Sequence, residues 1–231
     1  MANPTSFSGC AVGRDNSCCF DTLTPDELEL LNSNLIEIHY KKGEMICKQG
    51  TFASNIMFIC SGLVKVYYGN IKDSVILKIL PARNLVGLSS LFEENTLFQY
   101  SAYAYQDSVI QQIDINVFRQ LTKQNPLFAN EIINILSENV TQIYGRFFCF
   151  THKQSYGRLA DILLCLATRI YKANEFDLRL TRKELAELSG MSTERVIRIL
   201  KKFKEEGLIE INDKTFKILD DTKLQQISER G

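Results

Sequence analysis

Two short helices joined by a tight turn are predicted by one segment of this chain, TRKELAELSGMSTERVIRILKKF, which begins at Thr181. Leu185 and Leu188 give the first helix an apolar face, and the second helix has an apolar stripe made of Val196, Ile199 and Leu200. Gly190 lies between the helices and permits the positive φ that such a short turn requires. This pattern favours a helix-turn-helix that binds DNA over a plain helical hairpin.

Polar residues mark where both helices begin. Thr181 precedes the first helix with Glu184 three residues later, and Ser192 precedes the second, so each start has a side-chain oxygen that can cap free N–H groups. Residues 182–204 carry seven basic and three acidic side chains, which places positive charge on the second helix. The sequence GLIEINDKTFKIL that follows predicts a β-hairpin, the wing of a winged helix-turn-helix.

The composition of the chain limits the alternatives. Its 231 residues contain 27 basic and 27 acidic side chains, and neither a leader peptide nor a membrane-spanning apolar run is evident. Seven cysteines without regular spacing fit a reducing compartment better than a secreted disulfide framework. The chain has no phosphate-binding loop, dinucleotide fingerprint or metalloprotease motif. We therefore expect a cytoplasmic protein that is not an enzyme, does not bind membranes and holds no catalytic metal.

The stretch from His39 to Asp114 has a different pattern. It consists of short runs rich in β-branched and aromatic residues, such as NIMFICSGLVKVYYG and DSVILKILP, separated by glycines or polar turns. Many short strands with glycine at the corners predict a small barrel or jelly roll. The whole chain is thus expected to be an α+β protein with an N-terminal β-roll, a long dimerisation helix and a C-terminal winged helix-turn-helix.

The long helix is predicted from about Pro126 to Phe150. Apolar residues recur there at alternating steps of three and four, as in a coiled-coil seam: Ile133, Leu136, Val140, Ile143, Phe147 and Phe150. We expect this helix to pair with that of a second copy in a homodimer; the alternative is a core helix packed on its own β-roll. The predicted domains are residues 1–124, 125–150 and 151–231.

Six motifs follow one another along the chain: KKGEMICKQG, FICSGLVKVY, NLVGLSSLFEE, NPLFANEIINIL, GRLADILLCLA and LSGMSTERVIRILKKF. In this order they resemble the Crp/Fnr family of bacterial transcription regulators, over residues from about 20 to 220. The resemblance implies a β-roll like that of cyclic-nucleotide-binding domains. It also implies a sequence-specific DNA-binding regulator that acts as a homodimer on a near-palindromic operator, with RNA polymerase as a further partner.

The resemblance also implies which side chains contact DNA. The phosphate-contacting positions are Thr181, Arg182, Ser192 and Lys201, and the base-reading positions are Glu194 and Arg198. An arginine can bond guanine through O6 and N7, and a glutamate accepts from the amino group of cytosine, so we expect a half-site with a G·C core. Thr193 stands where the cyclic-AMP receptors of the family have a guanine-reading arginine, and Ile197 stands where its anaerobic regulators have a serine, so the outer bases are expected to follow neither type. The alternative role of Glu194 is a bond within its own helix.

The ligand pocket implied by the resemblance departs from that of cyclic-nucleotide binders. Its positions are Val86, Gly87, Leu88, Ser89, Tyr100, Ser101, Ile143 and Tyr144. Leu88 stands where those relatives have a ribose-binding glutamate, and Tyr100 where they have an arginine for the phosphate. Burying an anion without a cationic partner is costly. We therefore expect an empty pocket or a less charged, more apolar ligand rather than cyclic AMP, and the cofactor is unknown.

Redox or haem sensing is the alternative that the resemblance leaves open. Cys10, Cys18 and Cys19 lie where oxygen-sensing relatives place iron–sulfur ligands, although two adjacent cysteines ligate one cluster poorly. Reversible thiol oxidation and a tail with incidental thiols are the other interpretations. A haem ligand would have to be His39 or His152, the two histidines of the chain. A sensor that signals to a protein partner without binding DNA is the last alternative.

Overall fold

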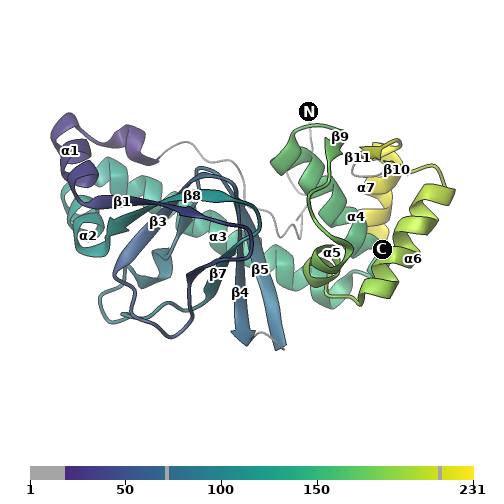
Figure 1. Ribbon diagram of the computed structural model, residues 1–231, viewed down its shortest axis with the longest axis horizontal. Helices are drawn as coiled ribbons and strands as arrows, with labels where there is room; N and C mark the ends of the chain where they lie inside the picture. The colour runs from purple at the N-terminus through teal and green to yellow at the C-terminus, as the bar shows by residue number, and fades with distance from the viewer. Residues whose placement is uncertain (1–18, 71–72, 213–214) are drawn as a thin grey trace. The chain divides into compact units, whose positions relative to one another are not determined.

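The computed structural model describes residues 19–70, 73–212 and 215–231 (Figure 1). These residues form two compact units, which divide after Val140. The boundary lies inside the longest helix, α3 (Pro126–His152), so one continuous helix contributes to both units. The predicted fold class is confirmed, whereas the three predicted domain limits stay a prediction.

The N-terminal unit is a β-roll made of two antiparallel four-stranded sheets. The first sheet has the order β1, β8, β3, β6, and the second has the order β2, β7, β4, β5. The strands are β1 (Leu35–Tyr40), β2 (Met45–Cys47), β3 (Asn55–Ser61), β4 (Leu63–Asn70), β5 (Asp73–Pro81), β6 (Leu85–Val86), β7 (Ser101–Ala104) and β8 (Ser108–Asp114). The predicted run NIMFICSGLVKVYYG thus becomes β3 and β4, with Gly62 at the corner between them.

Short helices close the ends of the β-roll, and side-chain caps fix where they begin. They are η1 (Cys19–Thr22), α1 (Pro25–Ser33), η2 (Leu88–Ser90) and α2 (Ile115–Gln124). Thr24 and Glu27 form a capping box at α1, and the carboxylate of Asp114 accepts two backbone N–H groups at α2. Asn125 Oδ1 accepts the N–H groups of Leu127 and Phe128 at 3.0 Å each, which starts α3.

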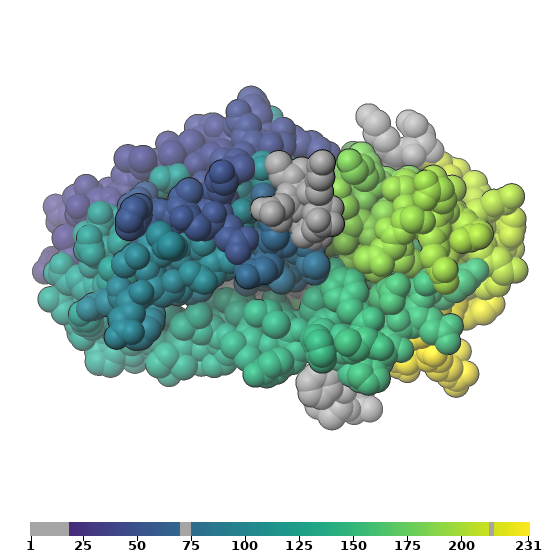
Figure 2. All heavy atoms as spheres, turned by 90° about the horizontal axis from the view of Figure 1, so that it is seen from below, coloured from purple at the N-terminus to yellow at the C-terminus, as the bar shows by residue number. Residues whose placement is uncertain are grey.

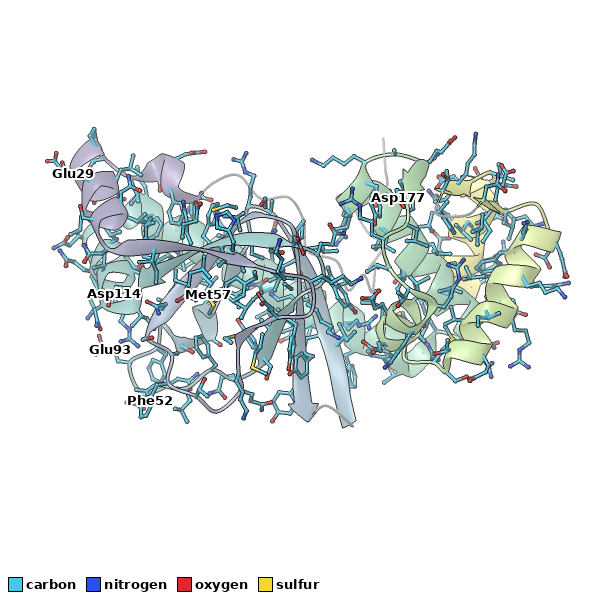
Figure 3. The ribbon with its side chains drawn as sticks, in the orientation of Figure 1. Glu29, Phe52, Met57, Glu93, Asp114 and Asp177 are labelled. Carbon is cyan, nitrogen blue, oxygen red and sulfur yellow. The ribbon has the colours of Figure 1, made fainter. Side chains whose placement is uncertain are left out.

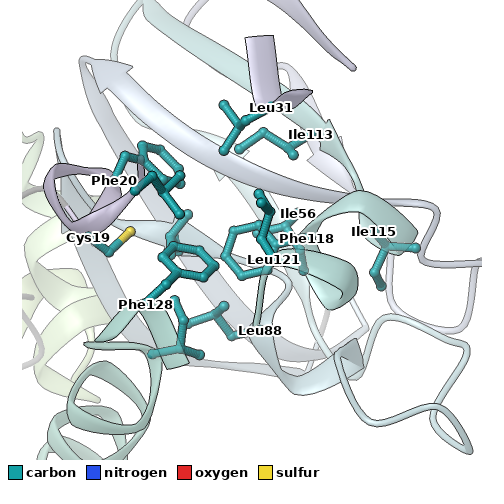
Figure 4. Close-up of a cluster of buried hydrophobic side chains, with 13 residues drawn as sticks. Cys19, Phe20, Leu31, Ile56, Leu88, Ile113, Ile115, Phe118, Leu121 and Phe128 are labelled. Atoms are coloured by element: carbon teal, nitrogen blue, oxygen red, sulfur yellow. The ribbon is translucent and has the colours of Figure 1, made fainter. Parts of the chain in front are cut away.

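Two apolar clusters hold the β-roll together. The first packs α1, α2 and the start of α3 against strands β3 and β8, and includes Phe20, Phe118 and Phe128 (Figure 4). The second fills the interior between the sheets, where Met57 is 1% exposed and points inward, while Phe52 is 78% exposed on an outer loop (Figure 3). Because Phe128, Ile132 and Ile135 of α3 pack in the first cluster, that helix is anchored to the β-roll as far as its third turn.

The C-terminal unit begins with the last turns of α3 and is mainly helical. Its elements are α4 (Ser155–Cys165), the π-helical turn η3 (Leu166–Tyr171), β9 (Glu175–Asp177), α5 (Arg182–Ser189), α6 (Thr193–Glu205), β10 (Ile209–Asn212), β11 (Thr215–Ile218) and α7 (Asp221–Arg230). The antiparallel pair β10 and β11 is the predicted wing, and β9 adds a third strand to it. Helix α7, which no pattern in the sequence analysis predicts, packs against α4.

Gly62 is the glycine of the β-roll whose replacement should cost most. Its φ is +96°, and a Cβ atom there would overlap the Ser108 side chain and lie 2.6 Å from the carbonyl oxygen of Asp107. Ser108 Oγ accepts the N–H of Leu63 at 3.2 Å, so this overlap would also disturb the corner. Gly50 has a similar φ of +80° but open space around it.

We therefore expect Gly50→Ala to lower the free energy of unfolding by about 1–3 kcal/mol through backbone strain alone, and Gly62→Ala to lower it further. Urea denaturation followed by circular dichroism of the two variants and the parent protein measures the difference. Equal losses in both variants would contradict the importance of the Ser108 contact.

Candidate nucleic-acid interface

Helices α5 and α6 form the helix-turn-helix, and their caps are those that the sequence predicts. Thr181 and Glu184 form a capping box at α5, and Ser192 Oγ accepts the N–H of Arg195 at 3.3 Å at the start of α6. Gly190 follows α5 with φ +61°, the left-handed conformation expected of the turn. The geometry of the motif therefore follows from local sequence signals.

Helix α6 has one buried face and one exposed face. Val196, Ile199, Leu200 and Phe203 are buried, which fixes how the helix is rotated about its axis. The other face exposes the predicted DNA-contacting side chains Glu194, Ile197, Arg198 and Lys201, with Thr193 half-buried at its start. Thr181 and Ser192 are exposed at the starts of the two helices, and Arg182 is half-buried. The sequence-predicted residues on α6 thus share one accessible surface.

The charged side chains on this surface differ in the hydrogen bonds and ion pairs that they form. Glu194 has a pKa below its usual value because its carboxylate accepts its own backbone N–H and the Ser192 hydroxyl, so it stays ionised at neutral pH. Lys201 forms an exposed ion pair with Glu205 at 3.8 Å, which contributes little to stability. Within the described part of the chain, Arg198 has neither a hydrogen-bond nor an ion-pair partner. Its guanidinium is therefore available to a ligand.

Two arginines outside the motif hold its turn in place. Arg146, buried on α3, donates from Nη2 to the carbonyl oxygen of Leu188. Arg158 on α4 donates from Nε to the carbonyl oxygen of Ser189 at 3.0 Å. These carbonyls end α5, where the helix leaves oxygens without internal donors and its dipole favours a positive charge. We call these two bonds the arginine clasp.

An aromatic ring completes the clasp. The guanidinium of Arg146 lies 4.1 Å from the centroid of the Phe150 ring, a cation–π distance. A Cβ atom at Gly190 would lie 2.6 Å from that ring, so only glycine lets the turn approach it so closely. The last turns of α3 are thus built into the helix-turn-helix. No sequence motif for DNA binding includes Arg146 or Phe150, and this is why sequence reasoning missed their role.

A buried polar cluster joins the end of α3 to α4 and α7. Lys153 Nζ lies 3.4 Å from Asp161 Oδ1 and donates to Ser228 Oγ at 3.1 Å, while Ser228 donates to Asp161 at 3.2 Å. The Lys153 and Asp161 side chains are 9% and 6% exposed. Cys149 donates to the other Asp161 oxygen at 3.8 Å, and burial, with this carboxylate, raises the pKa of its thiol. Every member has a partner, as a stable buried network requires.

At the predicted ligand positions of the β-roll, hydrogen bonds within the protein engage Gly87, Tyr100 and Ser101. The N–H of Gly87, at φ +98°, donates to the Tyr100 hydroxyl at 2.8 Å, and Ser101 Oγ accepts the N–H of Gln49 at 2.9 Å. Burial raises the pKa of Tyr100 to about 12, so its hydroxyl stays neutral. Val86 and Leu88 are buried beside it and Ser89 is half-buried. The Tyr100 hydroxyl therefore occupies the N–H group of Gly87.

The predicted seam of α3 is exposed along most of its length (Figure 2). The exposed fractions are 59% for Ile133, 37% for Leu136, 45% for Val140, 48% for Ile143 and 69% for Phe147. Tyr144, a predicted pocket residue, is 66% exposed. Phe150 differs because it packs on Gly190, so the exposed stripe ends at Phe147. Grouping Ile143 and Tyr144 with the β-roll positions in one pocket stays a prediction.

The candidate redox and haem residues that the structure describes have different surroundings. Cys10 and Cys18 lie outside the described residues, and Cys19 is 3% exposed in the first apolar cluster (Figure 4). His39 is exposed 3.7 Å from Glu37, and the His152 ring stacks on Phe148 with 4.5 Å between centroids. Among the described residues, no three His, Cys, Asp or Glu side chains gather as metal ligands. None of the helices described has the length and hydropathy of a membrane span.

Comparison with known proteins matches both units. Residues 37–125 match the model of the cyclic nucleotide-binding domain, and residues 157–227 match that of the Crp-like helix-turn-helix domain. The chain belongs to the Crp/Fnr family. The helix-turn-helix of this Crp/Fnr chain is thus the one formed by α5 and α6.

Curated relatives support the same assignment. The Crp/Fnr chain is 27% identical over 236 residues to Electron transport regulator A of Shewanella oneidensis, covering 97% of this chain and 93% of that protein. It is 27% identical over 192 residues to Transcriptional activator protein anr of Pseudomonas aeruginosa, covering 80% and 77%. It is also 25% identical over 233 residues to the Fumarate and nitrate reduction regulatory protein of Vibrio cholerae, covering 95% and 92%.

Solved Crp/Fnr-like structures share the fold. FixK2 from Bradyrhizobium japonicum superposes with a TM-score of 0.76 at 16% identity, covering 84% of this chain and 96% of that one. A CooA variant from Carboxydothermus hydrogenoformans superposes with a TM-score of 0.75 at 21% identity, covering 95% and 99%. At these identities the likeness establishes the fold alone.

The clasp predicts that α3 stabilises the turn of this Crp/Fnr helix-turn-helix. Arg146→Met leaves the Leu188 carbonyl without its buried donor, which should cost about 1–3 kcal/mol and increase opening of α5 and α6. Hydrogen–deuterium exchange read by mass spectrometry should show faster exchange there. Lys183→Met, an exposed change on α5, is the matched control. Unchanged protection of α6 in Arg146→Met would refute the role of the clasp.

Proposed function

We propose that the protein is a DNA-binding transcription regulator that acts as a homodimer on a near-palindromic operator. The observation that carries this proposal is the exposed face of α6, where Arg198 lies beside Glu194 and Lys201 and has no partner among the residues that the structure describes. The buried face of the same helix fixes its rotation, so these side chains present a defined pattern to a major groove. The regulator names of its relatives support the same function.

Base recognition is assigned to the middle of this face. Arg198 donates to O6 and N7 of a guanine, and Glu194 accepts from the amino group of a cytosine, which gives the half-site a G·C core. Glu194 can do so only by giving up part of its bonding at the helix start. Thr181, Arg182, Ser192 and Lys201 hold phosphates, while Thr193 and Ile197 face the outer bases, where an isoleucine can contact a thymine methyl.

Selection of binding sites from random duplex DNA tests the proposal. The purified protein should enrich a near-palindrome with a G·C core in each half-site, in air or under anaerobic conditions. Enrichment in only one of these two conditions would indicate the signal to which the protein responds. Enrichment of no sequence under any condition would count against direct DNA binding and for the alternative, a sensor that acts through a protein partner.

Arg198→Ala is expected to weaken binding to the selected operator by about 1–3 kcal/mol and to relax the preference at one base pair. Binding to unrelated DNA should change little, because the lost contact is to a base edge. Lys202→Ala is the control: Lys202 is exposed on α6 and ion-paired with Glu206 at 3.5 Å. Fluorescence anisotropy with operator and scrambled duplexes measures both variants. Equal losses on the two duplexes would argue against base reading by Arg198.

Dimerisation is assigned to the exposed stripe of α3. A contiguous row of large apolar side chains on one helix face marks a protein–protein contact, and the three–four spacing matches a parallel coiled coil. Pairing along this stripe would place two α6 helices about one turn of DNA apart, roughly 34 Å. Operator symmetry would then follow from the symmetry of the dimer.

Phe147→Glu should shift the protein towards monomer, because it places a charge among the apolar side chains of the seam, at the end of its exposed stripe. Ile36→Glu is the control, since Ile36 is 60% exposed on β1 and is not part of the seam. Sedimentation velocity over a concentration series compares the two variants with the parent protein. A Phe147→Glu variant that remains as dimeric as the control would refute the seam.

Signal transmission is assigned to α3, because that helix is shared by the two units. A change that rotates α3 in the β-roll would reach the turn before α6 through Arg146 and Phe150. A ligand shifts such an equilibrium only through different affinities for the two states. RNA polymerase is the expected downstream partner.

The signal itself is not expected to be cyclic AMP, because the Tyr100 hydroxyl occupies the Gly87 amide. Redox sensing is the second candidate, and the names of relatives such as Electron transport regulator A favour it. An iron–sulfur cluster would need ligands beyond the described cysteines, since no group of three candidate ligands gathers among the described residues.

A further inference from the structure

A cavity of the β-roll gathers three sulfur side chains. It has a volume of about 310 Å³ and is lined by residues of β2 in one sheet and of β3 and β8 in the other. Met45 and Cys47 line it from β2, and Met57 lines it from β3. As far as the structure describes its lining, the cavity includes none of the eight positions predicted for the ligand pocket and no residue of α3. It is therefore a separate site.

Two of the sulfur side chains face the interior from opposite sheets. Cys47 pairs with Ala102 on β7, and Met57 pairs with Val86 on β6. Side chains of directly paired residues share one face of a sheet, and both Ala102 and Val86 are fully buried in the second apolar cluster. Cys47 is 7% exposed and Met57 is 1% exposed in the same cluster. The thiol and the thioether thus enter one space from two sides.

The third sulfur lies at the mouth of the cavity. Met45 begins β2 and is 40% exposed, although it belongs to the same lining. An unbranched methionine has three rotatable side-chain bonds, so its thioether can turn towards an ion held by Cys47 and Met57. Access to the cavity is therefore on the side of Met45.

The kind of donor limits which metal ion could bind here. Thiolate and thioether ligands select copper(I), whereas magnesium and calcium need oxygen ligands. Zinc sites are built from cysteine, histidine and carboxylates, and the described lining has one cysteine but no histidine, aspartate or glutamate. Lys48 is the charged residue of that lining, and its positive charge makes a doubly charged ion still less favourable. The donor set favours a soft, singly charged ion.

Burial leads to the same choice of charge. It raises the pKa of the Cys47 thiol to about 12, so the thiol keeps its proton while no metal is bound. A metal ion would replace that proton, because the thiolate is the ligand. One thiolate neutralises one positive charge, but a divalent ion would leave a net charge among apolar side chains, which is costly. The thiol gives up only a weak 3.9 Å bond to the Tyr100 carbonyl oxygen.

We propose that Met45, Cys47 and Met57 bind one copper(I) ion through a thiolate and two thioethers. The Cys47 proton passes to solvent as the S–Cu bond forms, and no electron is transferred. The site goes beyond the proposed regulator function, since it needs neither DNA nor pairing of α3. The alternative role of these methionines is apolar packing, because methionine fills irregular gaps in a core.

Nuclear magnetic resonance of the full-length protein tests the site. Labelling the methionine methyl groups with ¹³C gives a separate signal for each of the four methionines. Copper(I), or its redox-inert counterpart silver(I), is titrated with glutathione present as a competitor for other thiols. The signals of Met45 and Met57 should shift together, whereas Met191, in the turn before α6, should stay unchanged. Zinc(II) should leave all these signals in place.

Two variants separate ligation from packing. Met57→Leu fills a similar space without a sulfur, so it should keep the thermal midpoint nearly unchanged. It should need at least about tenfold more silver(I) to shift Met45, since even outer partners of a metal ligand have effects of that size. Cys47→Ser should show the same loss. Cys60→Ser is the control, because Cys60 lies on β3 outside the described lining.

Three outcomes would overturn the site. They are unmoved Met45 and Met57 signals in the parent protein, an equal shift with zinc(II), and a Cys47→Ser variant that responds like the parent. Each would leave the three sulfurs as packing groups. Operator binding by the same preparation, measured separately, distinguishes this failure from failure of the proposed regulator function.

Discussion

The free carbonyl oxygens at the end of helix α5 constrain the helices around it in the C-terminal unit. Its last carbonyl oxygens need donors, and the turn that follows is too short to provide them. Arg146 and Arg158 provide two from other helices, and the first belongs to the helix that also anchors in the β-roll. Because the end of α5 needs these donors, the rotation of α3, a helix outside the helix-turn-helix, affects how α6 is held.

Those parts of the fold that depend on neighbouring residues could be predicted from the sequence. The caps at Thr181 and Ser192, the left-handed Gly190 and the hairpin of the wing depend on residues a few positions apart. The exposed face of α6 follows from the same periodicity. The arginine clasp could not be predicted in this way, because Leu188 lies 42 positions from Arg146 in the chain and its acceptor is a backbone atom, which carries no sequence signal.

The ligand pocket shows a different limit. Comparing single positions with a family pattern identified the missing cation and glutamate, but not what fills their place. Tyr100 satisfies Gly87 from 13 positions away in the chain, and a comparison of single positions does not show such a contact. Phe150 illustrates the same point, since its spacing fits the seam while its ring packs on Gly190.

The cluster of Lys153, Asp161 and Ser228 links helix α7 to the helices of the DNA-binding unit. Ser228 lies in the last turn of α7 and satisfies both members of a desolvated ion pair from the far end of the chain. Removing the last few residues, Ser228 among them, would therefore leave Lys153 and Asp161 without one of their hydrogen-bond partners. The C-terminal residues, which look dispensable in the sequence, need to be kept in any engineered derivative, and a fusion partner there should follow a spacer.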